Sequence, residues 1–253
     1  MTADTPARGQ IPSLRALWKE AFGDGDAFLD TFFTTAFSPD RCRCTAVGAD
    51  AAAALYWFDC TWQNRRAAYI YAVAAARAYR GQGIASALME DTHRHLQSCG
   101  YDGAVLVPGS GELFRFYRRF GYRECSRIRE IRCTASAVAA EIRRTDAEEY
   151  ARLRRRYLPE NGVLQEGENL RFLQTQASFY TGDGFVLAAY REGDLLHGTE
   201  LLGRADAAPA IVRAMGCTEG QFRIPGDDRP FTMFLPLRDT PVPPPSYFGL
   251  AFD

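Results

Sequence analysis

The sequence contains no apolar run that approaches the roughly 20 residues a membrane-spanning helix needs. Its opening residues, MTADTPARGQ, lack the basic and then apolar pattern of a signal peptide. The 7 cysteines are an odd number without a disulfide framework, and no second pair with histidine follows Cys42-x-Cys44. We therefore expect a cytoplasmic protein with reduced thiols, no membrane contact and no bound metal.

An excess of charge of either sign is also missing. Lysine and arginine total 30 and aspartate and glutamate total 31, so the net charge is −1 at neutral pH. No overall field would then draw the chain to nucleic acid or to an anionic membrane. Arginines cluster within residues 127–132 and 152–156, and both clusters are interpreted as solvated faces or strand-edge charges. We expect no nucleic-acid partner, since such a partner would require steeply salt-dependent binding.

Two common nucleotide-binding motifs are absent, namely G-x-G-x-x-G with its acidic partner and Gly-Lys-Ser/Thr. In their place, a strand-like segment at residues 69–73 leads to Arg80-Gly81-Gln82-Gly83-Ile84-Ala85, and a helix is predicted over 86–97. Two close glycines at a strand-to-helix turn leave backbone N–H groups uncovered at the positive end of the helix dipole. The stretch predicts an anion-binding turn.

The first half of the chain predicts a mixed α/β layer around this turn. Apolar spacing and turn residues indicate helices over 11–22 and 26–37, strands over 43–48 and 53–61, a strand over 103–107, a helix over 112–120 and a strand over 123–134. The aromatic residues of the first two helices could form core or line a substrate pocket, and core is the preferred interpretation.

The pattern restarts beyond residue 136. A strand from residue 142, helices over 146–158 and 167–180, strands over 184–191 and 195–203, a helix over 206–215 and strands over 219–224 and 230–237 are predicted. This order suggests a second, degenerate copy, with domains at residues 1–135 and 136–253. Gly203-Arg204-Ala205-Asp206 stands where the copy's turn would be, so we expect no cofactor there.

Two motifs resemble those of the GNAT superfamily of acetyl-CoA-dependent N-acetyltransferases. Arg80-x-x-Gly83-x-Ala85 is similar to its Arg/Gln-x-x-Gly-x-Gly/Ala signature, and FYRRFGY at 116–122 resembles its F-Y-x-x-x-G-F helix. The resemblance covers residues 8–135 and implies the GNAT acyl-CoA N-acyltransferase fold. The tandem arrangement resembles the first two domains of the enhanced-intracellular-survival acetyltransferases.

The resemblance implies acetyl-CoA as co-substrate, without a metal. Its pantetheine arm would add to the strand through Val73, Ala74 and Ala75, as an extra strand does. Its pyrophosphate would accept hydrogen bonds from the backbone of the turn, whose residues are Arg80, Gly81, Gln82, Gly83, Ile84, Ala85 and Ser86. The family usually has a proline where this chain has Arg77, a departure that concerns the rigidity of the turn.

Tyr117 matches the tyrosine that acts as general acid in the family, although a buried tyrosine on its helix's apolar stripe would look the same. The base is not evident, and Asp59 and Glu112 are no better than surface charges. In the resembling family the C-terminal carboxylate is the base. Because residues 246–252 form an apolar tail that should be docked, we hypothesise that Asp253 has this role; otherwise the tail packs the domains together.

The sequence thus predicts an enzyme that transfers acetyl from acetyl-CoA to a primary amine of a small molecule or peptide. It does not select the acceptor. It also leaves the oligomeric state open, although strand edges could pair in a homo-oligomer. The alternative is a non-catalytic acyl-CoA-binding or sensor protein. No serine or cysteine nucleophile motif accompanies a histidine, so a hydrolase triad is not supported.

Overall fold

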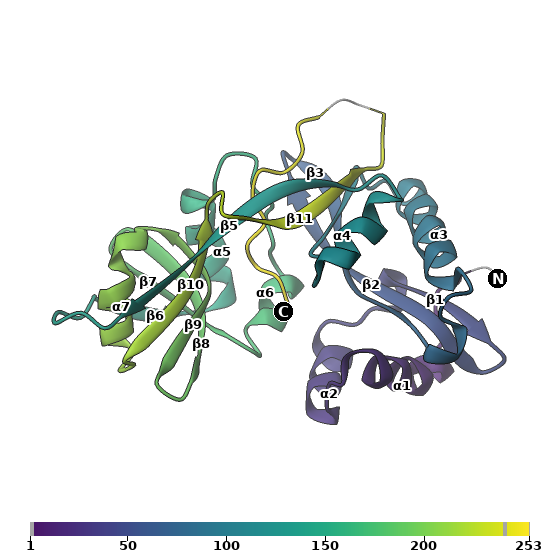
Figure 1. Cartoon of the computed structure of the whole chain (residues 1–253), viewed down its shortest axis with the longest axis horizontal. Coiled ribbons are helices and arrows are strands. Elements are labelled where there is room, and N and C mark those ends of the chain that lie inside the picture. The colour runs from purple at the N-terminus through teal and green to yellow at the C-terminus, as the bar shows by residue number, and fades with distance from the viewer. Residues whose placement is uncertain (1–2, 240–241, 253) are drawn as a thin grey trace. The chain divides into compact units, whose positions relative to one another are not determined.

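The computed structural model describes residues 3–239 and 242–252. Contacts divide the chain into two compact units, and each unit is made of two pieces of sequence (Figure 1). The first unit consists of Met1–Arg123 and Met233–Val242, and the second of Glu124–Thr232 and Pro243–Asp253.

This division differs from the boundary predicted after residue 135. Strand β5 (Arg123–Thr134) pairs with β10 (Glu219–Pro225), which is a strand of the second unit. The last part of β11 (Arg229–Pro236) pairs instead with β4 (Gly103–Leu106) of the first unit. Both pairings join residues about a hundred positions apart, so local sequence pattern does not reveal them.

The first unit is a twisted sheet with helices on both faces. Its other elements are α1 (Ile11–Phe22), α2 (Asp26–Thr35), β1 (Cys42–Val47), β2 (Asp50–Trp62), β3 (Arg65–Ala75), α3 (Ile84–Ser98) and α4 (Gly111–Arg118). The strand order is β1-β2-β3-β4-β11, in which β3 and β4 are parallel and the other pairs are antiparallel. The predicted helices and strands of this half are present, with ends that differ by a few residues.

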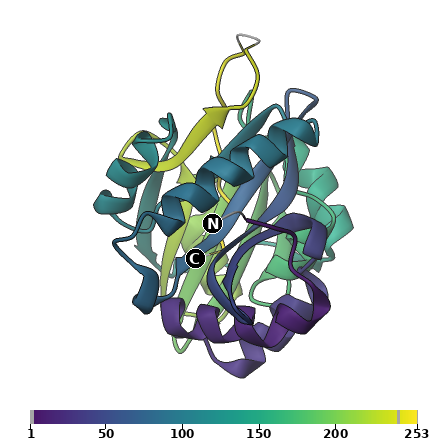
Figure 2. The ribbon, with the colours of Figure 1, turned by 90° about the vertical axis from the view of Figure 1, so that its right-hand side faces the viewer.

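Alternation along the strands explains the two helical layers. Leu55, Trp57 and Ile70 are in one buried cluster with residues of α3 and α4. On the opposite face, Trp18 of α1 and Phe32 of α2 are 2% and 1% exposed and pack on strand aromatics. Figures 1 and 2 show α3 and the purple helices α1 and α2 on different sides of the sheet. For Trp18 and Phe32, the core interpretation is confirmed.

The second unit repeats most of this order of elements, but it begins with an additional strand and, among the described residues, has no counterpart of α4 between β10 and β11. After β6 (Ile142–Thr145) come α5 (Ala147–Tyr157), α6 (Glu168–Leu173), β7 (Ser178–Gly182), β8 (Phe185–Glu192), β9 (Leu195–Gly203) and α7 (Ala208–Ala214). Its strand order is β11-β5-β10-β9-β8-β7-β6, and β9 and β10 are parallel as β3 and β4 are. The predicted fold class, a mixed α/β fold followed by a second copy, is confirmed.

One predicted element of the second half is wrong. The helix expected over 167–180 ends at Leu173, and Ser178–Gly182 forms β7, which pairs with β6 and β8. Phe179, Tyr180 and Thr181 favour a strand, and their pairing partners on both sides decide the conformation.

Both units carry a β-bulge in the third strand of the repeat. In β3, Ala72 and Val73 together face the single residue Leu55 of β2, and Ala72 has a positive φ of 49°. In β9, Thr199 is the extra residue opposite β8. A bulge bends the strand and strengthens its twist. In both units the third strand parts from the fourth just before the bulge: β3 pairs with β4 over residues 67–69, and β9 with β10 over 195–198.

Within residues 3–239 and 242–252, none of the helices combines the length and the apolar character needed to cross a membrane.

Candidate active site

The Gly-rich turn, residues 80–86, connects β3 to α3 and has the conformation expected of its glycines. Gly81 and Gly83 have φ values of 74° and 79°, which glycine adopts without a Cβ penalty. Gly83 is the residue that precedes helix α3. The side chains of Arg80 and Gln82 fold back: Arg80 Nε donates to the Ala75 carbonyl at 3.0 Å, and Gln82 Nε2 donates to the Ala78 carbonyl at 3.0 Å.

The backbone N–H groups of residues 81–86 are available to a ligand. Just before the turn, the N–H groups of Tyr79 and Arg80 donate to carbonyls of the same loop. Just after it, the Ala87 N–H donates to the Gly83 carbonyl and begins the helical pattern. Among the described residues, no hydrogen-bond acceptor is found for the six N–H groups between them. Orphan donors at a helix start bind anions readily.

A cavity of about 310 Å³ lies beside these donors. Seven of the ten predicted cofactor residues line it: Ala75, Arg80, Gly81, Gly83, Ile84, Ala85 and Ser86. Tyr79 completes this side, and Phe116 and Arg119, at the end of α4, supply the opposite wall. Arg119 was not predicted. Its position three residues after Phe116, on the same helical face, is the signal that could have identified it.

Val73 and Ala74 do not line this cavity but lie on the adjoining part of β3. The register of β3 with β4 ends at Tyr69, which leaves the edge of β3 beyond it without a neighbouring strand from β4. Residues 71–73 are correspondingly half-buried rather than buried. An extended ligand chain could hydrogen-bond to such an edge, as the resemblance to the GNAT superfamily implies for pantetheine.

Arg77, where the family usually has proline, lies three residues before this turn and forms a hydrogen bond to another element. Its backbone N–H donates to Glu20 Oε1 at the end of α1. A proline has no N–H and could not form this bond. In this chain the hydrogen bond from Arg77 to Glu20 of α1 restrains the backbone at residue 77. In the family a proline ring would restrain the same position.

Tyr117 lies on α4 but does not line the cavity. It is 7% exposed and packs in the buried cluster that also contains Ile84, a cavity residue. Burial raises the pKa of Tyr117 to about 12, so the phenol is protonated at neutral pH. Its ring lies 5.8 Å from that of Tyr122, whose hydroxyl is 3.0 Å from Nε2 of His93.

Neither of the two acidic candidates for the base, Asp59 and Glu112, lines the cavity. Asp59 pairs with Ala68 on β3, about 23 Å along the strand from Ala75 at roughly 3.3 Å per residue. It accepts a hydrogen bond from Tyr101 and lies 3.6 Å from Arg66. The Glu112 side chain is 87% exposed at the start of α4 and lies 3.9 Å from Arg115. Asp253, the remaining candidate, lies outside the described residues.

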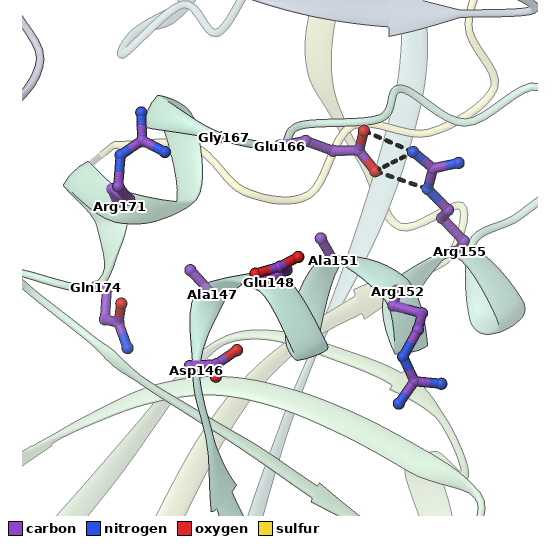
Figure 3. A pocket seen from close by; sticks show the side chains of 10 residues that line it. All are labelled: Asp146, Ala147, Glu148, Ala151, Arg152, Arg155, Glu166, Gly167, Arg171 and Gln174. Atoms are coloured by element: carbon purple, nitrogen blue, oxygen red, sulfur yellow. Dashed lines mark hydrogen bonds and ion pairs between the residues drawn. The ribbon is translucent and has the colours of Figure 1, made fainter.

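A second cavity of about 650 Å³ lies in the second unit, between α5 and the segment that contains α6 (Figure 3). At one end, Arg155 donates through Nε and Nη2 to the two carboxylate oxygens of Glu166, each at 2.6 Å. Three acidic and three basic side chains line this cavity, so its walls do not select an anion. It contains none of the predicted site residues. Among the described residues, no three histidine, cysteine, aspartate or glutamate side chains cluster as metal ligands would.

Comparisons with known proteins bear on the family and on the fold. Residues 4–125 match the family model described as "Acetyltransferase (GNAT) domain". The fold is similar to that of a GCN5-related N-acetyltransferase from Anabaena variabilis, with a TM-score of 0.74 at 13% identity over 94% of this chain and 73% of that one. It is similar to Eis1 from Mycobacterium abscessus, with a TM-score of 0.69 at 13% identity over 94% and 74% of the two chains. A GCN5-related N-acetyltransferase from Kribbella flavida gives a TM-score of 0.69 at 16% identity over 92% and 70%. Among curated proteins, none matches.

Residues 4–125, slightly less than half of the chain, are thus similar to a GNAT acetyltransferase domain. At these identities the similar structures establish the fold alone, and they do so across both units, since the matched parts cover more than nine-tenths of this chain.

Proposed function

We propose that this protein is an acetyl-CoA-dependent N-acetyltransferase that transfers the acetyl group directly to a primary amine. One observation carries the proposal: the six backbone N–H groups of residues 81–86 have no acceptor among the described residues, and all of these residues except Gln82 line a cavity that also contains Arg80 and Arg119. The pyrophosphate of coenzyme A matches these donors in charge and in the number of acceptor oxygens. The open edge of β3, at Val73, Ala74 and Ala75, then accommodates the pantetheine arm.

In the proposed reaction the neutral amine attacks the thioester carbonyl, the C–N bond forms and the C–S bond breaks. Tyr117 is the general acid for the departing sulfur. Because its pKa of about 12 lies above the value of about 8.5 for an ordinary thiol, its main contribution is hydrogen-bond donation to the thiolate. The amine must lose a proton, and the hypothesised base is the C-terminal residue, Asp253. Deletion of Phe252 and Asp253 should then abolish turnover, and an unchanged rate would remove Asp253 from the mechanism.

The experiment for the whole proposal measures release of coenzyme A from acetyl-CoA in the presence of a panel of amines: peptide N-termini, lysine, polyamines and aminoglycosides. Chromatographic detection is preferable to a thiol reagent, because exposed Cys99 would itself react. Turnover with at least one amine is expected. The proposed partner is therefore a small-molecule or peptide amine.

One observation favours a second candidate, a non-catalytic acyl-CoA-binding or sensor protein. Tyr117 is buried in the core and does not line the cavity. Binding of acetyl-CoA without turnover on any amine would support that candidate and contradict the enzyme.

A further inference from the structure

The C-terminal segment, residues 246–252, is buried within the second unit. Tyr247, Phe248 and Leu250 are each at most 1% exposed, and the ring of Phe252 packs edge-on against Phe172 of α6 at 5.1 Å. Figure 1 shows the yellow end of the chain running beside α6. Burial of these apolar side chains is itself stabilising, so the segment is held by its contacts with the surface it covers and not only by its covalent link to the chain.

The second unit holds this segment largely through its backbone. The Val163 N–H donates to the Tyr247 carbonyl at 2.8 Å. Gln165 Nε2 donates to the Leu250 carbonyl at 2.6 Å, and Arg223 Nη1 donates to the Gly249 carbonyl at 3.2 Å. Backbone carbonyls bound by side-chain and main-chain donors are the usual means of recognising an extended peptide.

Gly249 lies where the third and fourth strands of this unit have parted. Glu200 follows the bulge of β9, and Arg223 follows the last residue of β10 that pairs with β9. A Cβ at Gly249 would lie 2.3 Å from Glu200 Oε1 and 2.1 Å from Tyr247 Oη. Any larger residue would have to displace these two side chains, so the site favours glycine at this position for reasons of space rather than backbone conformation. In the first unit, the corresponding opening is the proposed position of the pantetheine arm.

The Arg154–Glu200 ion pair in the wall of this site is formed without the segment. Arg154 was expected on a solvated face, but it is 1% exposed and forms a buried ion pair with Glu200. Its Nε and Nη2 donate to Glu200 at 2.6 and 2.9 Å, and its Nη1 donates to the Val163 carbonyl at 3.0 Å. Tyr150 Oη also donates to Glu200 at 2.9 Å. Because the donors of Arg154 and Tyr150 have their acceptors within the rest of the unit, this ion pair does not depend on the segment for its charge balance. The donors of Val163, Gln165 and Arg223, in contrast, have their acceptors on the segment.

We propose that this part of the second unit is a peptide-binding site whose resident ligand is the chain's own C-terminal segment. The segment is held non-covalently, and a free peptide of the same sequence exchanges with it. The ligand class is an extended peptide with glycine between aromatic and aliphatic residues. The opening that serves the cofactor in the first unit thus serves the chain's own tail in the second.

The test separates the segment from the chain without removing it. A protease recognition sequence is inserted after Asp239, the folded protein is cut, and a fluorescent synthetic peptide of residues 242–253 is added in excess. The cut tail should remain bound through size-exclusion chromatography, and the labelled peptide should then replace it. Uncut protein, whose tail is tethered, should bind much less peptide.

Substitutions are placed in the peptide, so that folding of the protein is not affected. A Gly249→Ala peptide should compete about tenfold or more weakly, because its Cβ has no space. A Pro244→Ala peptide, changed at an exposed residue of the same segment, should compete as the natural peptide does. The proposal is overturned if the cut protein unfolds, if no exchange occurs without denaturant, or if the Gly249→Ala peptide competes equally well.

Discussion

Tyr117 is the single residue on which the proposed chemistry depends most. Substitution of Tyr117 by phenylalanine removes one hydroxyl from a buried ring that packs against Phe116 and Tyr122. We predict that kcat falls by about 100-fold or more, as loss of an acid catalyst does, while the affinity for coenzyme A is unchanged. Steady-state rates and a calorimetric titration measure the two quantities. A variant with the natural kcat would show that Tyr117 is only a core residue.

His93 gives the stability of the protein a predicted pH dependence. Burial, and then the nearby Arg94, lowers the pKa of His93 from 6.5 to about 4. The unfolded chain therefore binds this proton more readily than the folded one between these values. The contribution to stability is complete above pH 6.5 and is lost as the pH falls towards 4. We predict a loss of about 2 kcal/mol from this group between pH 7 and pH 5.

Denaturant unfolding at the two pH values measures this loss. His93→Gln is the matched variant, because glutamine does not titrate and its amide can still reach the Tyr122 hydroxyl. The variant should be less sensitive to acid than the natural protein by that amount. Equal acid sensitivity in both proteins would contradict the assignment.

At the scale of elements, helix α3 provides a direct test of the Gly-rich turn. Gly83 precedes the helix with a φ of 79°, and Gly100 follows it with a φ of 84°. A Cβ would meet no atom within 4 Å at Gly83 and only Arg238 at 3.7 Å at Gly100. Alanine at either position should therefore cost about 1–2 kcal/mol of stability through its backbone conformation alone.

Only the Gly83→Ala substitution should affect the cofactor. Relaxation of that residue out of the left-handed region turns the N–H groups of Gly83 and Ile84 away from the cavity, so we predict about a tenfold loss of affinity for coenzyme A. Gly100→Ala, with similar strain at the far end of the same helix, should bind coenzyme A normally. Similar affinities in the two variants would argue against pyrophosphate binding by this turn.

The sequence predicted helices and strands well where neighbouring residue types determine where an element begins or ends. The helix α1 ends at Gly23, and the hairpin between β2 and β3 turns at Gln63 and Asn64, as residue types alone indicate. Strand β7 was missed because its partners β6 and β8 determine its conformation. Of the site, glycines and spacing identified the turn, whereas Arg119 and Glu20 reach it from other elements and carry no motif.

At the scale of the whole molecule, the repeat was predictable but its exact composition was not. The order of elements recurs in the sequence, so a second copy could be inferred. The exchange of β5 and β11 between the units depends on pairing partners far away in the chain, and no local pattern encodes it. The assignment of catalysis to the first domain and of a degenerate role to the second stays a prediction.

The two units also differ in what they offer to coenzyme A. The first has the Gly-rich turn and its cavity, whereas the second has Gly203 and Arg204 at the corresponding place and a tail beside its strand opening. We therefore predict that each chain binds one coenzyme A, in the first unit.

Calorimetric titration of the full chain with coenzyme A measures this most directly. The account predicts one site per chain, and one site again after the C-terminal segment has been cut and replaced by a free peptide. A chain that binds no coenzyme A, or that binds two, would contradict it.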